Sequence, residues 1–219
     1  RTDKSTMSQQ TLMELVIENI TNKYRICVDP ENPENIVDWP SLRFKDNQEV
    51  IEIDWSCREP EGSLALKWLP PTVQRFYVIG DIFMAPWITG TINLTALPLA
   101  MTHLDMMGNC LEGKISLTSL PPPMVLLCLA ENRLSGTLDF THLPKTMRAI
   151  RLSVNKFEGM SDFSKLPDSL EEIDIRNNKL LEGTIQVDEN TLFCQVTGTK
   201  VETHVIKQRI LMHGPEVPL

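Results

Sequence analysis

A repeat of 23 residues runs through the middle of the chain and constrains its fold more than any other feature. Leucines and asparagines recur at this interval, at Leu97, Leu120, Leu143 and Leu166 and at Asn109, Asn132, Asn155 and Asn178. A fixed period of this length predicts stacked supersecondary units, each of which buries its apolar face against its neighbours. The stretch from residue 97 to residue 183 is the most regular part of this array.

The same internal spacing of three apolar residues begins earlier, near Val50. Six units share it: Val50/Ile53/Trp55, Val73/Phe76/Val78, Met101/Leu104/Met106, Met124/Leu127/Leu129, Met147/Ile150/Leu152 and Leu170/Ile173/Ile175. The step from Val73 to Met101 is 28 residues, so the unit that carries MAPWITG has a five-residue insertion, which we expect in a loop. In the fifth unit, Ser161 stands where an apolar residue is expected.

The unit L-x-x-L-x-L-x-x-N, followed by glycine and closed in the first five coils by Leu-Pro, resembles leucine-rich repeat proteins. The resemblance covers about residues 50 to 187. It looks closest to the plant-like type and, within it, to protist proteins with 23-residue units of the form L-D-L-T-x-L-P. It implies an α/β solenoid, a right-handed superhelix with short parallel strands on its concave face. Arg58 and Asp81 stand where the pattern has asparagine, so the first two units are less regular.

Three regions follow from where the period holds: an N-terminal cap of helix and irregular wrap at 1–48, six repeats at 49–187, and a C-terminal cap and tail at 188–219. A helix is expected over about residues 7–23, because Thr6 and Gln9 have capping-box spacing and apolar residues then recur at helical intervals. After Val187 the period ends, and alternating residues at 192–196 and 200–212 predict a β-rich cap that pairs with the last coil.

The composition limits the classes of partner that we expect. A formal net charge of −8 argues against nucleic acid as the main partner. No apolar run reaches the length that a membrane span needs, so no membrane insertion is expected within this chain. The sequence has no Cys-x-x-Cys pair, phosphate-binding loop or cofactor fingerprint, and we therefore expect no metal site and no cofactor.

Cysteines and sequons bear on the compartment. Cys27 and Cys57 flank the first coil, and the resemblance implies a disulfide between them, as in the caps of secreted leucine-rich repeat proteins. The alternative is two free thiols in a reducing compartment. Asn19 and Asn93 begin glycosylation sequons, although such triplets also arise by chance. An extracellular or membrane-tethered location is favoured over a cytoplasmic one, and the compartment stays open.

In each strand, the side chains between the inward ones must point out of the concave face. Apolar and aromatic members of this set cluster over the middle coils, with charged residues on both sides, as in protein-binding surfaces. We therefore expect a partner-binding face made of Tyr77, Ile79, His103, Asp105, Met107, Leu126, Cys128 and Arg151. The alternative is the ordinary scatter of apolar residues on a protein surface.

Catalysis is not expected, although His103, Asp105 and Cys128 form a Cys/His/Asp set on neighbouring strands. His103 and Asp105 lie on one strand about 6.5–7 Å apart, and no glycine-rich oxyanion turn adjoins Cys128. The predicted function is non-catalytic recognition of a protein or peptide through the concave face. Two alternatives stay open: a ligand-sensing ectodomain fragment of a larger leucine-rich repeat receptor, with its kinase or membrane segment outside this chain, and an architectural spacer.

Overall fold

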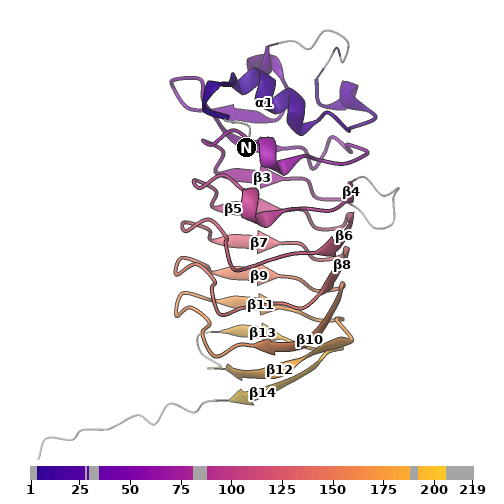
Figure 1. Cartoon of the computed structure of the whole chain (residues 1–219), viewed down its shortest axis with the longest axis vertical. Coiled ribbons are helices and arrows are strands. Elements are labelled where there is room, and N and C mark those ends of the chain that lie inside the picture. The colour runs from indigo at the N-terminus through magenta and orange to yellow at the C-terminus, as the bar shows by residue number, and fades with distance from the viewer. Residues whose placement is uncertain (1–3, 28, 30–34, 81–87, 188–191, 206–219) are drawn as a thin grey trace, which may run out of the picture.

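The computed structural model describes residues 4–27, 29, 35–80, 88–187 and 192–205. The chain winds into a stack of coils, a β-solenoid, with helix α1 at one end and strands β13 and β14 at the other (Figure 1). Each full coil contributes one rung to a long sheet on one side of the stack. The inserted loop expected around MAPWITG falls mostly on residues 81–87, which lie outside the described residues.

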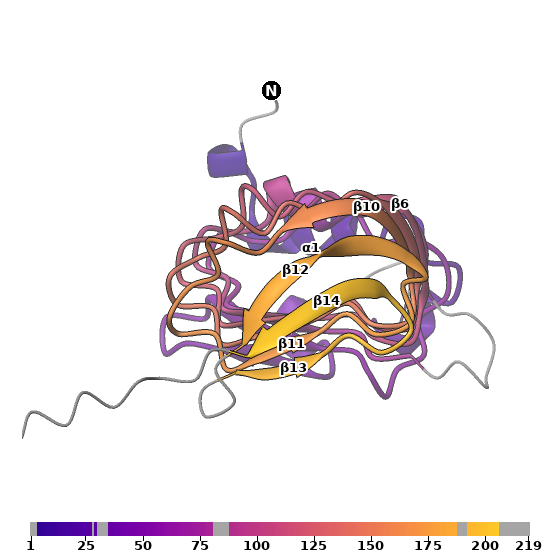
Figure 2. The ribbon, with the colours of Figure 1, turned by 90° about the horizontal axis from the view of Figure 1, so that it is seen from below.

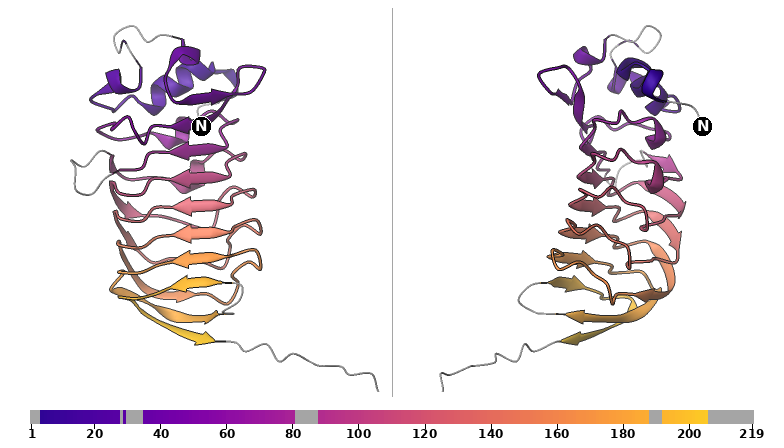
Figure 3. Two further views of the ribbon diagram at one scale, coloured as in Figure 1. Left: turned by 180° about the vertical axis from the view of Figure 1, so that it is seen from behind. Right: turned by 60° about the vertical axis from the view of Figure 1, so that its left-hand side comes forward.

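The rungs form an eight-stranded sheet in the order β1-β2-β3-β5-β7-β9-β11-β13, seen as a ladder in the left view of Figure 3. All neighbouring rungs are parallel except β1 and β2, which are antiparallel. The strands are β1 (Leu42–Phe44), β2 (Val50–Asp54), β3 (Arg75–Tyr77), β5 (His103–Asp105), β7 (Leu126–Cys128), β9 (Ala149–Arg151), β11 (Glu172–Asp174) and β13 (Phe193–Gln195).

A second, six-stranded parallel sheet covers another side of the coils, in the order β14-β12-β10-β8-β6-β4. Its strands are β4 (Thr89–Gly90), β6 (Cys110–Lys114), β8 (Arg133–Gly136), β10 (Lys156–Asp162), β12 (Leu180–Val187) and β14 (Lys200–Val205). The view along the stack in Figure 2 shows β12 and β14 turning across the end of the solenoid towards β11 and β13. This sweep narrows the last coils and covers the core at that end.

The core lies inside the coils, between the two sheets. All members of the six predicted apolar triplets are 0–4% exposed, which confirms the spacing that predicted them. Each such side chain contributes about 1.5–3 kcal/mol when fully buried. Aromatic rings bridge neighbouring coils: Phe140 and Phe163 stack with centroids 4.8 Å apart, and Trp55 meets Phe76 edge to face at 5.8 Å. The core is therefore continuous along the stack.

The repeating asparagines are buried and hold neighbouring coils together. The amide nitrogen of Asn132 lies within 3.0–3.1 Å of the carbonyl oxygens of Met106, Leu129 and Ala130, and its Oδ1 accepts from the backbone N–H of Leu111 at 2.9 Å. Asn109, Asn155 and Asn178 repeat this pattern. Their side chains satisfy backbone groups that the coil buries without a ladder partner.

The first coil lacks the asparagine, because Arg58 stands at that position. Here Asn22 of the cap is buried and supplies the amide: its Nδ2 donates to the carbonyl of Glu59 at 2.9 Å, and its Oδ1 accepts from the N–H of Glu61 at 2.8 Å. The cap thus replaces, from another segment, the polar side chain that the first repeat lacks.

The N-terminal helix is shorter than predicted. α1 spans Gln9–Val16 rather than residues 7–23, and its N-cap is Ser8, whose hydroxyl accepts from the N–H of Thr11 at 3.1 Å. Beyond the helix, the backbone pairs with the first coil: Thr21 donates to Glu61 at 2.8 Å, and Ser63 donates to Asn19 at 3.2 Å. These bonds compete with further helical turns and end the helix.

Short 3-10 helices complete the described structure. They are η1 (Lys4–Thr6), η2 (Lys23–Arg25), η3 (Ile36–Asp38), η4 (Leu66–Trp68) and η5 (Leu94–Ala96). The first three belong to the wrap around α1, and the last two precede the Leu-Pro turns of their coils. α1 buries Leu12, Met13 and Val16 against the first coil, where the N–H of Ala65 donates to the carbonyl of Val16 at 3.1 Å.

Both sheets continue beyond Val187. β13 pairs with β11 and β14 with β12, and Cys194 and Val196 occupy the positions of Ile173 and Ile175 at a step of 21 residues. Thr199 takes the place of the asparagine: its hydroxyl donates to the carbonyl of Val196 at 2.6 Å and accepts from the N–H of Val201. The described strands of the expected β-rich segment thus pair with the last coil, and residues 206–212 of that segment lie outside the described residues.

Candidate functional site

The outer surface of the eight-stranded sheet, called here the sheet face, presents side chains from every coil in register. One row runs Asp54, Tyr77, Asp105, Cys128, Arg151, Asp174, and the adjacent row runs Glu52, Arg75, His103, Leu126, Ala149, Glu172. Neighbouring members of a row are about 4.8 Å apart, the spacing of hydrogen-bonded strands. The fold thus brings the predicted face residues together on one surface.

Apolar and aromatic groups lie over the middle coils of this face. Tyr77, Met107 and Leu126 are half-buried, and Ile79 is 37% exposed. Larger exposed fractions occur elsewhere, at Leu99 (79%) and Met160 (71%). The sheet face is therefore distinguished by apolar residues on three neighbouring rungs, β3, β5 and β7, and not by the exposure of any one side chain.

Cys128, a predicted partner-contacting residue, offers almost no accessible surface in this structure. Its residue is 1% exposed, although it occupies an outward position in the row. Its neighbours in the row are Asp105 and Arg151, which have longer side chains. The Asp105 carboxylate raises the pKa of the small Cys128 thiol, and the Arg151 guanidinium lowers it. The next outward residue along the strand direction, Ala130, is also buried, at 4%. The two small side chains at the centre of the face, Cys128 and Ala130, are thus covered by their larger neighbours.

The environment of Cys128 opposes thiol chemistry. Burial, together with the adjacent Asp105 carboxylate, raises the pKa of the thiol to about 12, whereas a nucleophilic cysteine needs a lowered pKa. Burial and the neighbouring Arg75 lower the pKa of His103, whose Nδ1 lies 2.8 Å from the Thr102 hydroxyl. Among the described residues, no group of three His, Cys, Asp or Glu side chains is placed to hold a metal ion.

Ion pairs lie on both sides of the apolar residues at the centre of the sheet face. Glu52 accepts from Arg75 at 2.6 Å and lies 3.2 Å from Arg43. On the opposite side, Arg151 donates to both carboxylate oxygens of Glu172 at 2.8 and 2.6 Å. The arginines of the face are therefore already engaged by acidic partners within the chain.

Two carboxylates of the face are not engaged in this way. Asp54 and Asp105 form no ion pair with any residue that the structure describes. Asp54 accepts a local backbone N–H from Ser56, and Asp105 accepts one from Met107 and a hydrogen bond from the Cys128 thiol. They flank Tyr77 in the row. Burial is the main reason that the pKa of Tyr77 is raised, and Glu52, Asp105 and Asp54 raise it further while Arg75 lowers it. Three carboxylates and one guanidinium group thus act on the ring.

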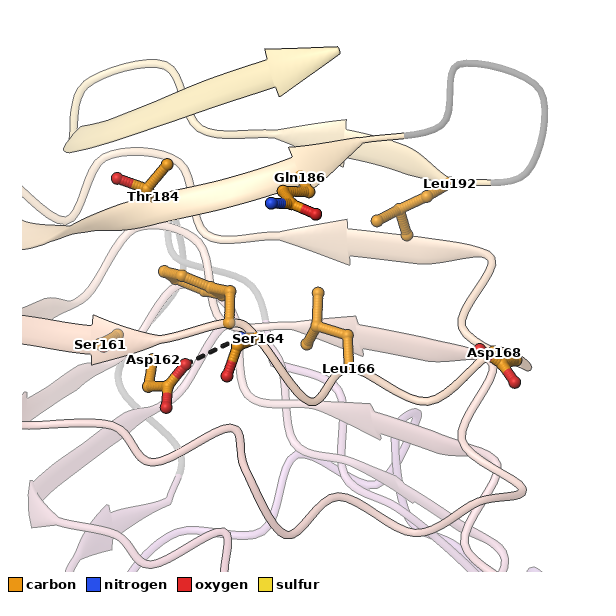
Figure 4. Close-up of a pocket in the computed structure, with 9 residues that line it drawn as sticks. Ser161, Asp162, Ser164, Leu166, Asp168, Thr184, Gln186 and Leu192 are labelled. Atoms are coloured by element: carbon orange, nitrogen blue, oxygen red, sulfur yellow. Dashed lines mark hydrogen bonds between the residues drawn. The ribbon is translucent and has the colours of Figure 1, made fainter. Parts of the chain in front are cut away.

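A separate cavity of about 680 Å³ opens near the C-terminal end of the stack. It forms because β10 stops pairing at Asp162 and the chain turns away, while β12 continues to Val187. Figure 4 shows Thr184 and Gln186 of β12 on one side of the opening and Ser164 and Leu166 on the other. Sequence reasoning missed this cavity. Its one signal was Ser161, the polar residue at an apolar position, which lines the opening and donates to the Leu138 carbonyl.

The cavity lies at a single coil boundary, whereas the sheet face carries side chains from every coil. The sheet face is therefore the larger and more regular surface for a macromolecular partner. Sequence reasoning found its apolar centre but left Glu52, Asp54 and Arg75 out of the site. Their strand register placed them on the same face, and the ion pairs that distinguish them are visible only in the structure.

The remaining predicted residues lie away from this face. Cys27 is buried and Cys57 exposed, and both are free thiols in the structure, so the disulfide that the resemblance implied is not formed in it. The sequon residues Asn19 and Asn93 are both exposed. The side chain of Asn93 already accepts from the backbone N–H and the hydroxyl of Thr95, at 3.0 and 2.7 Å. Within the described part of the chain, no helix is both long and apolar enough to cross a membrane.

Together, the parallel rungs, the asparagine ladder and the apolar triplets define a leucine-rich-repeat solenoid. No protein-family model and no curated protein matches the sequence. Two solved structures share the fold. The leucine-rich-repeat ectodomain of the receptor kinase SOBIR1 from Arabidopsis thaliana is similar with a TM-score of 0.61 at 16% identity, over 80% of this chain and 95% of that one. Pollen Receptor Kinase 3 is similar with a TM-score of 0.66 at 19% identity, over 88% and 95%.

Proposed function

We propose that this chain is a non-catalytic recognition module that binds a protein or peptide through the sheet face. The observation that carries the proposal is that Tyr77, Ile79, Met107 and Leu126 come from three neighbouring rungs of one face, β3, β5 and β7, with ion pairs on both sides. Apolar and aromatic centres with charged rims are typical of protein-binding surfaces.

The rigidity of the face supports recognition. The rungs β5, β7, β9 and β11 are each held by parallel pairing on both sides and by an asparagine buried beneath the turn that follows. The outward side chains are therefore fixed relative to one another before a partner arrives. A preorganised surface loses less conformational entropy on binding than a flexible one.

A role as the ligand-sensing part of a larger receptor is the alternative, and it uses the same face. The two similar structures are named for receptor kinases, and the likeness at 16–19% identity extends to the fold alone. The sequence of the full-length protein would distinguish a receptor fragment from a separate binding module. Either form predicts that the sheet face contacts the ligand.

The test compares partner capture by the wild type and by a Tyr77→Asp/Met107→Asp variant. Proteins retained by the immobilised wild type are identified by mass spectrometry, and the variant is expected to lose them. Two new carboxylates in the patch would disrupt apolar contact and leave charges desolvated in the interface. Circular dichroism and a thermal melt must show that the variant is folded.

The matched control is Leu99→Asp/Met160→Asp, which adds the same charges at more exposed apolar residues away from the sheet face. This control is expected to retain the partners. Equal capture by the wild type and by the folded Tyr77→Asp/Met107→Asp variant would refute the proposal.

A further inference from the structure

The electrostatics of the sheet face indicate the chemistry of the partner, on the premise that the proposed function is right. Among the described residues, Arg43, Arg75, Arg151 and Arg176 are the arginines of this face with a carboxylate partner, and their partners are Glu52, Glu172 and Asp174. Arg43 and Arg75 share Glu52, so these four guanidinium groups meet three carboxylates. Asp54 and Asp105 are the two further carboxylates in the row, and neither forms an ion pair with a described residue.

Asp54 and Asp105 lie on opposite sides of one aromatic ring. Their residues pair in register with Tyr77, from β2 and from β5. Because β3 lies between β2 and β5, the Cα atoms of Asp54 and Asp105 are about 9–10 Å apart, twice the inter-strand spacing, with Tyr77 on the strand between them. A cation over the ring, within the roughly 6 Å range of a cation–π contact, would thus have a carboxylate-bearing residue on the neighbouring strand at either side, about 5 Å away.

The surrounding groups leave room for a positive charge from outside. The guanidinium of Arg75 is held by Glu52 at 2.6 Å, and that of Arg151, on the far side of Cys128, is held by Glu172. His103 stands in the adjacent row, and its lowered pKa favours the neutral ring near pH 7. Ile79 and Met107 provide apolar surface beside the ring for the aliphatic part of a long side chain.

We infer that the partner is a protein segment that places a lysine or arginine side chain over the Tyr77 ring, between Asp54 and Asp105. The charge complementarity extends to the whole molecule, whose net charge of −8 favours the approach of a basic segment. The inference specifies the partner as a basic peptide or a basic surface segment of a protein.

The experiment selects peptides from a random display library on the immobilised wild-type protein. Peptides whose binding is lost in the Ile79→Asn/Met107→Asn variant, which removes the apolar surface without adding charge, are retained as ligands of the sheet face. These peptides are expected to be enriched in lysine or arginine at one position. Their affinities are then measured by fluorescence anisotropy, at low salt and at about 0.5 M salt, where ion pairs between exposed groups are screened.

The decisive variant is Asp54→Asn/Asp105→Asn. It removes both charges but keeps an amide oxygen for the bonds from Ser56 and Met107, so the local turns are retained. The affinity of the selected peptides is expected to fall about tenfold, as for the loss of two partly exposed ion pairs.

The structure offers a matched control in Asp139→Asn/Asp162→Asn. These exposed carboxylates accept from the N–H two residues ahead, at Thr141 and Ser164, as Asp54 and Asp105 do, but they lie away from the sheet face. The control is expected to bind the peptides as the wild type does. An equal loss in both double variants would indicate a general charge effect and overturn the inference.

The outcomes separate the two proposals. If peptides bind the sheet face without enrichment of lysine or arginine, or bind Asp54→Asn/Asp105→Asn unchanged, the inference fails while the proposed function stands. If no peptide depends on Ile79 and Met107, and partner capture also survives Tyr77→Asp/Met107→Asp, both fail.

Discussion

The side-chain amide nitrogen of Asn132 lies 3.0 Å from the carbonyl oxygen of Met106, 26 residues earlier in the preceding coil. The same amide also bonds the carbonyls of Leu129 and Ala130 and the N–H of Leu111, all inside the stack. Replacing Asn132 by Leu would leave these buried groups unpaired, at about 1–3 kcal/mol for each unsatisfied group. We expect Asn132→Leu to lower the free energy of unfolding by at least about 2 kcal/mol.

Chemical denaturation of Asn132→Leu beside Arg133→Ala checks this prediction. Arg133 is the adjacent residue and is exposed, so its truncation should change stability by no more than about 0.5 kcal/mol. Equal destabilisation by the two substitutions would contradict the role assigned to the asparagines.

The repeat could be predicted from sequence because its determinants are local and recur. The apolar triplets and the asparagines each perform one task in every coil, so period and residue type coincide. The 23-residue period is lost after Val187 because Thr199 replaces the asparagine with a smaller side chain and the step shortens to 21 residues. The end of α1 escaped prediction because it is set by pairing with the first coil, about forty residues away in sequence.

The sheet face was predictable in outline for the same reason: alternation along each strand decides which side chains point outward. The burial and the ion pairing of the individual side chains on this face could not be predicted. The burial of Cys128 depends on the lengths of Asp105 and Arg151 on the neighbouring rungs. Which carboxylates of the face stay outside ion pairs depends on which arginine pairs with which carboxylate. The set of outward-pointing residues does not determine this pairing.

Gly62 joins the cap to the first coil. It has φ +122°, and a Cβ there would collide with the main-chain carbonyl oxygen of Asn19. We expect Gly62→Ala to displace the cap and lower the free energy of unfolding by more than about 2 kcal/mol. Hydrogen exchange should become faster in α1 and in the segment that pairs with residue 20, because both depend on this contact.

Gly90→Ala is the matched control for Gly62→Ala. Gly90 also has a positive φ, +83°, but the nearest atom to its added Cβ would be the Ser63 Cβ at 3.6 Å, an ordinary contact. Gly90→Ala should therefore lower the free energy of unfolding only through backbone strain, and hydrogen exchange in α1 should not become faster. Similar exchange in both variants would mean that the collision with Asn19 is unimportant.

The cysteines should differ widely in their reactivity. Cys57 is exposed, whereas Cys128 is 1% exposed and its pKa is raised to about 12 by burial and by Asp105. At pH 8 only about one Cys128 thiol in ten thousand would be ionised, and the thiolate is the reactive form. Alkylation of the folded protein by iodoacetamide, followed by peptide mass spectrometry, should label Cys57 well before Cys128. Comparable labelling rates in the folded state would be inconsistent with the buried site.

The same thiol should make stability fall at high pH. Because the folded state binds the Cys128 proton more tightly than the unfolded state does, this stabilisation is complete below the ordinary thiol pKa. It is lost as the pH rises from about 9 towards about 12. The free energy of unfolding of the wild type should therefore decline more steeply over this window than that of Cys128→Ala. Parallel slopes for the two proteins would show that Cys128 does not contribute.

Asp174 should act in the opposite direction, at low pH. Burial alone would raise the pKa of this carboxyl group, but hydrogen bonds from Arg176 and Ser153 outweigh it and leave the pKa below its ordinary value. A lowered pKa contributes stability above the ordinary carboxyl pKa of about 3.9, which is lost as the pH falls below it. Asp174→Asn should thus be less stable than the wild type at pH 7 and should lose less on acidification from about pH 5 to about pH 2. Asp168→Asn, at an exposed carboxylate, is the control and should follow the wild-type acid profile. If Asp174→Asn also follows that profile, the ion pair with Arg176 does not stabilise the end of the sheet, and the rim of the sheet face there is held by backbone pairing alone.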